Sequence, residues 1–136
     1  MRDRVAAMRW LGVFAVAVHA AVLLGHGAAH SDLGVVLALW QQVYAYTLIV
    51  AGPLVAAALL GAGRLRPGFT LLAVCMLASL LFGVYHHYVA VSPDHVAHLP
   101  PGEAQPLFRA TAAGMGVVEA AGVVIGWLGL RQQRHG

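Results

Sequence analysis

The chain has 136 residues, of which 60% are hydrophobic and only 10% are charged. A soluble domain of this size carries about 25% charged residues, so the composition excludes an ordinary soluble protein and indicates an all-α integral membrane protein. The small excess of Arg over acidic residues does not indicate nucleic-acid binding, because membrane topology accounts for it.

Four apolar stretches cover most of the chain, and each reaches the length of about 20 residues that a membrane-spanning helix needs. We expect spans at about Ala6–Ala29, Leu33–Leu60, Phe69–Val91 and Leu107–Leu130. The connections between them are too short for a separate soluble domain. Residues 1–136 are therefore predicted to form a single domain, an up-down bundle of four transmembrane helices.

The connections predict how neighbouring spans meet. Only residues 30–32 separate the first two spans, so these spans are expected to be antiparallel neighbours. Pro53 lies inside the second span and is expected to kink it. The segment Gly61–Gly68 contains Gly, Pro and Arg and predicts a turn between spans two and three.

The connection of residues 92–106 is the one long loop. It begins with Ser92, Pro93 and Asp94, which suit the N-cap and first turn of a helix. We therefore expect a short helix over Ser92–Leu99, on the outer side of the membrane.

The arginines predict the orientation of the bundle. Seven of the eight precede span one or lie at its start, separate spans two and three, or follow span four. They are Arg2, Arg4, Arg9, Arg64, Arg66, Arg131 and Arg134. In a four-span protein these positions share one side, and positive residues favour the cytoplasm. We expect a multi-pass protein of the inner (plasma) membrane with both termini cytoplasmic.

Two ionisable residues are predicted near the middle of their spans. His19 and Glu119 both lie deep in the expected helices, where an unpaired charge is costly. Glu119 also shares a helical face with the small residues Ala112, Gly122 and Gly126, which favour close helix packing. We therefore expect His19 and Glu119 to form a buried polar pair.

Six of the eight histidines gather at the outer end of the predicted bundle. They are His26, His30, His86, His87, His95 and His98, and Asp94 lies beside them in the loop. Cys75, Ser79 and His86 share one face of span three, so His86 rather than His87 is expected to point inward.

Imidazole is a ligand of zinc, copper, iron and nickel, and carboxylates complete such sites. We therefore favour an outward-facing transition-metal site, for copper or zinc, that serves metal handling or redox chemistry. One alternative is b-type haem held between His26 and His86, as in electron-transfer subunits. Two others are histidines that bind no ligand at the membrane interface, and a non-catalytic accessory subunit of a larger membrane complex. Lipid is the expected partner, nucleic acid is not, and enzyme activity and homo-oligomer formation are left open.

Overall fold

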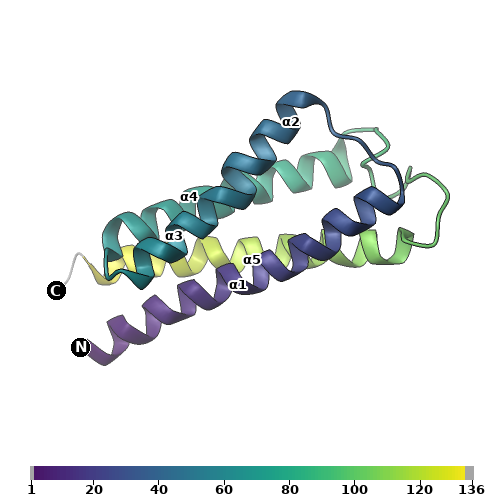
Figure 1. Cartoon of the computed structure of the whole chain (residues 1–136). Helices are drawn as coiled ribbons and strands as arrows, with labels where there is room; N and C mark the ends of the chain where they lie inside the picture. Colours follow the sequence, from purple (N-terminus) through teal and green to yellow (C-terminus); the bar gives the residue numbers. More distant parts are fainter. Residues whose placement is uncertain (1, 134–136) are drawn as a thin grey trace.

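The computed structural model describes residues 2–133, and all regular secondary structure within them is helical (Figure 1). Its elements are α1 Arg2–Asp32, α2 Leu39–Tyr44, η1 Ala45–Ala51, α3 Gly52–Gly61, α4 Leu65–Val84, η2 Tyr85–Val89 and α5 Gln105–Gln132. The two η elements are π-helical turns that continue their neighbours. The predicted all-helical class is confirmed.

Four continuous helical stretches are long and apolar enough to cross a membrane: Asp3–Asp32, Leu39–Gly61, Leu65–Val89 and Gln105–Gln132. Large apolar side chains cover the outside of the bundle, and Leu24 is 76% exposed. Exposed apolar side chains on this scale suit a lipid environment rather than water.

The bundle is held together through α5, which packs against both α4 and α1. The buried face of α5 includes Ala112, Met115, Glu119, Gly122 and Gly126, the face expected from helical spacing. A Cβ at Gly126 would lie 2.8 Å from the backbone nitrogen of Ala73 on α4, so only glycine permits this approach.

The two ends of the bundle differ in construction. The start of α1, the end of α5 and the α3–α4 turn lie at one end, while the other two connections lie at the opposite end (Figure 1). Toward that second end, α1 and α2 diverge (Figure 1). Arg134, one of the arginines used to predict orientation, lies outside the described residues.

The second span begins six residues later than expected, at Leu39 rather than Leu33. Residues 33–38 form a turn and an extended segment, because Gly34 takes a positive φ of 63° and stops α1. The amide of Val35 donates to the carbonyl of His30, 3.0 Å away, as in a helix C-cap.

Pro53 lies directly after the π-helical turn η1. Proline has no N–H and its ring collides with the preceding turn of an α-helix. In this chain the amide of Gly52 donates to the carbonyl of Thr47, five residues back, which makes the turn before Pro53 wider. The sequence predicted a kink at Pro53, and the structure has this wide π-helical turn directly before it.

The short helix expected over Ser92–Leu99 does not form, and this segment consists of successive turns. Its backbone is tied to η2, where the amide of Val96 donates to the carbonyl of His87 at 3.0 Å. Asp94 is 5% exposed. Burying the carboxylate of Asp94 inside the bundle replaces its expected role at the start of a solvent-exposed helix.

Candidate metal centre

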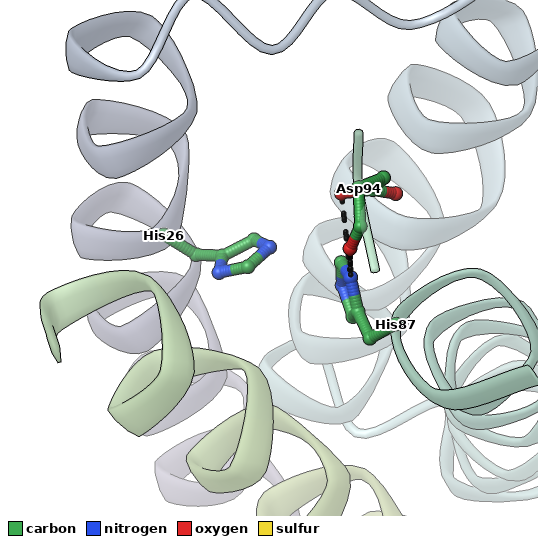
Figure 2. A group of neighbouring side chains, drawn as sticks. All are labelled: His26, His87 and Asp94. Carbon is green, nitrogen blue, oxygen red and sulfur yellow. Dashed lines mark hydrogen bonds and ion pairs between the residues drawn. The ribbon is translucent and has the colours of Figure 1, made fainter. Parts of the chain in front are cut away.

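Three segments that are distant in sequence bring His26, His87 and Asp94 together inside the bundle. His26 comes from α1, His87 from η2 and Asp94 from the loop before α5, as Figure 2 shows. One potential ligand atom of each residue lies within 4.8 Å of those of the other two. The three residues are 4%, 5% and 5% exposed, so the group is buried among the helices and not at an outer face. This group could hold a metal ion.

The His26 side chain has one satisfied and one free ring nitrogen. Its Nδ1 lies 3.0 Å from Oγ1 of Thr111, whose hydroxyl already donates to the carbonyl of Leu107 at 2.7 Å. Since that hydroxyl has a single hydrogen, Oγ1 of Thr111 accepts from Nδ1–H of His26. The other nitrogen, Nε2, therefore carries a lone pair, and it is buried without a hydrogen-bond partner. In Figure 2 this nitrogen points toward Asp94 and His87.

His87 is fixed by the loop that follows it. Its Nδ1 lies 3.0 Å from the backbone carbonyl oxygen of Asp94 and 3.3 Å from Oδ1 of the same residue. Ring nitrogens of metal-binding histidines are commonly oriented in this way by a carbonyl or a carboxylate.

Asp94 supplies a negative charge between two imidazoles. Its Oδ1 lies 3.1 Å from Nε2 of His30 and 3.3 Å from Nδ1 of His87. Burial raises the pKa of the Asp94 carboxyl, but hydrogen bonds from His30 and His87 outweigh burial, so its pKa lies well below its usual range. The carboxylate is therefore ionised at neutral pH. A cation bound in this group would neutralise the carboxylate of Asp94.

Phe108 forms an aromatic wall behind the histidines. Its ring centroid lies 4.6 Å from that of His26, 4.9 Å from that of His30 and 5.4 Å from that of His87. Phe108 is completely buried. It excludes water from this side of the group, which strengthens electrostatic interactions within the group.

His86 is buried but belongs to a different environment. Its Nδ1 lies 3.3 Å from Nε2 of Gln41, and its ring lies 4.4 Å from Phe82 and 5.7 Å from Trp40. The preference for His86 as the inward residue is therefore corrected, because His87 is the one that joins His26. The wide turn η2 alters the helical register at this point.

The expected haem arrangement requires His26 and His86 to face each other. The structure instead directs His86 toward Gln41 and Trp40, whereas the ring partners of His26 are His30, His87 and Phe108. The His26 and His87 rings are 4.8 Å apart edge to face, which leaves no space between them for a porphyrin.

The two loop histidines do not enter the group. The rings of His95 and His98 pack on each other with centroids 4.9 Å apart, and His98 is exposed. Asp32, another acidic residue near this end of the bundle, is exposed at the end of α1. His30 is adjacent to the group through its contact with Asp94.

The buried pair expected deeper in the bundle is present as a contact. Nε2 of His19 lies 3.2 Å from Oε1 of Glu119, and each residue is 1% exposed. Gly83 lies between this pair and the group above, since a Cβ there would be 3.8 Å from His87 and 3.9 Å from Glu119.

Two residues of α5, Phe108 and Thr111, were not considered in the sequence analysis. Phe108 lies four residues before Ala112, so it extends the small-residue face already recognised around Glu119. Extending that face by one turn would have found Phe108. Thr111 has no such signal, because threonines that bond only their own helix are common.

In comparisons with protein-family models, curated proteins and solved structures, nothing matches this chain. Its function therefore has to be inferred from the geometry of its own residues.

Proposed function

We propose that this protein binds a divalent transition-metal ion through His26, His87 and Asp94, for metal handling or redox chemistry. The observation that carries the proposal is the free, buried Nε2 of His26, directed at an ionised carboxylate and a second imidazole. Buried polar atoms without partners are rare, and a bound ion is one of the accepted explanations.

The ligand set favours zinc or copper(II). Two imidazole nitrogens and one carboxylate oxygen are the ligands of several zinc enzymes, which leave a fourth position open. The group contains no sulfur, and copper(I) prefers thiolate or thioether ligands. Around zinc the ligand atoms would be about 3.3 Å apart, so the group would contract from its present separation of up to 4.8 Å.

We further propose that the metal end of the bundle faces the extracytoplasmic side of the plasma membrane. Six of the eight arginines, all but Arg109 and Arg134, lie in the first eight residues of α1, in the α3–α4 turn or the first turn of α4, or at the end of α5. Those positions are at the end opposite the histidines (Figure 1). Positive charge favours the cytoplasmic side, which leaves the histidine end outside.

Metal analysis of detergent-purified protein tests the proposal. After reconstitution with zinc and removal of free metal, we expect about one equivalent per chain, consistent with a single buried site. Asp94→Asn removes the only negative charge of the group at nearly constant size, and should abolish retention. Asp32→Asn is the matched control, because Asp32 is exposed and lies outside the group. Wild-type protein that retains no zinc or copper would refute the proposal.

A further inference from the structure

A large cavity lies beside the metal group, between α1 and the stretch formed by α2, η1 and α3. Its volume is about 1080 Å³, just above the range of about 300–1,000 Å³ typical of small-molecule sites. It exists because α1 and α2 diverge toward this end of the bundle (Figure 1). His26, His87 and Asp94 all contribute to its lining.

The walls of the cavity are apolar and reach the lipid-facing surface. Leu23, Ala45 and Ile49 contribute to the walls. Leu24, Val36 and Tyr46 also line the cavity and are 76%, 84% and 67% exposed. Side chains that line a cavity and also face lipid mark an opening toward the bilayer. A ligand would therefore enter from the membrane rather than from water.

The polar groups of the cavity specify the head of such a ligand. Among the described residues that line it there is no arginine, while Asp94 contributes a carboxylate. Without a bound metal ion, an anionic head such as a phosphate or a fatty-acid carboxylate would face this carboxylate with no arginine beside it. A neutral oxygen-containing head could instead hydrogen-bond to the histidines or bind a metal ion through its oxygen.

We infer that the cavity binds a membrane-soluble amphiphile with a neutral oxygen head and a single apolar chain, such as an alcohol or a phenol. The head lies beside His26 and Asp94 at the polar end of the cavity, and the chain occupies the apolar part between α1 and η1. The head shares these residues with the proposed metal site, whereas the position of the chain depends only on the cavity.

Photolabelling in lipid nanodiscs tests the inference. The probe is dodecanol with a diazirine near the end of its chain, and adducts are mapped by mass spectrometry of peptides. We expect adducts to concentrate on the cavity-lining residues of α1 and η1. Ala20→Phe fills the cavity from α1 and should reduce these adducts at least about fivefold. Ala45→Phe fills it from the opposite wall and should act in the same way.

Two controls test whether labelling is specific to the cavity and to a neutral head. Ala21→Phe changes the next residue of α1, which is exposed and does not line the cavity, and should leave labelling unchanged. In zinc-free nanodiscs, a dodecanoic acid carrying the same diazirine should label the cavity residues less than the alcohol at neutral pH. Adducts spread evenly over the lipid-facing helices, equal labelling by the acid in zinc-free nanodiscs, or labelling that neither filling variant reduces would overturn the inference.

Zinc content is measured in the same nanodiscs, so that the metal site and the amphiphile-binding cavity are tested independently. Protein that retains zinc but shows no cavity labelling refutes the amphiphile and leaves the metal site intact. Protein that labels at the cavity without retaining zinc refutes the metal site and leaves the chain-binding cavity intact. Zinc retained by the filling variants also shows that these variants are folded.

Discussion

His26 illustrates how one hydrogen bond prepares a side chain for metal binding. Thr111 fixes the tautomer of His26 by accepting from Nδ1, and this leaves the lone pair of Nε2 directed at Asp94 and His87. A residue that hydrogen-bonds a metal-binding histidine, without touching the metal itself, typically contributes about 10- to 100-fold to metal affinity. Thr111 should therefore matter for metal binding although it would not touch the ion.

Thr111→Val tests this outer role. Valine keeps the shape of threonine but cannot accept the hydrogen from Nδ1 of His26, so we expect zinc affinity to fall about 10- to 100-fold. Competition with a chelator of known affinity measures the change. Thr47→Val is the control, because the hydroxyl of Thr47 bonds only carbonyls of its own helix. Equal affinities for the two variants would contradict the role assigned to Thr111.

At the scale of elements, the π-helical turn η2 determines which of two adjacent histidines enters the metal group. The amide of Ala90 donates to the carbonyl of Tyr85, five residues back, at 2.7 Å. Such a turn takes in about one residue more than an α-helical turn, which shifts the following side chains by roughly 100°. Consecutive residues of an α-helix are also about 100° apart. Regular α-helical spacing therefore predicts His86 at the inward position, whereas the structure places His87 there.

The adjacent histidines provide a matched pair of variants. His87→Gln should lower zinc affinity by more than about 100-fold, because it removes a ligand and not only an outer partner. His86→Gln should leave affinity unchanged, since His86 contacts Gln41 and Phe82 outside the group. Zinc titration of both proteins in detergent makes the comparison. A larger loss for His86→Gln would mean that the register assigned to η2 is incorrect.

At the scale of the whole molecule, much of the arrangement could be predicted from hydropathy and chain direction. Four apolar stretches give four helices, and their alternation brings His26 and the His86–His87 pair to one end of the bundle. The choice between His86 and His87 could not be predicted, because π-helical turns have no reliable sequence signal. Asp94 was expected beside the histidines, but its burial inside the bundle was not predicted, since it depends on tertiary contacts with His30 and His87 and not on local helix propensity.

The orientation of the bundle gives a prediction at this scale. In a Cys75→Ala background, a cysteine at Ala97 should react with a membrane-impermeant maleimide added to intact cells. A cysteine at Ala62, in the turn at the arginine end, should react only after the cells are lysed. Both positions are exposed, so burial does not bias the comparison. The opposite pattern would place the histidine end in the cytoplasm.

The most direct measurement of the metal site is X-ray absorption at the zinc edge of the loaded protein. We expect nitrogen and oxygen atoms bound to zinc at distances of about 2.0–2.1 Å, and additional scattering from two imidazole rings. In His87→Gln the signal of one imidazole should disappear, while in His86→Gln both should remain. A shell with sulfur ligands, or a spectrum that retains two imidazoles in His87→Gln, would contradict the assignment of His26, His87 and Asp94 as the metal site.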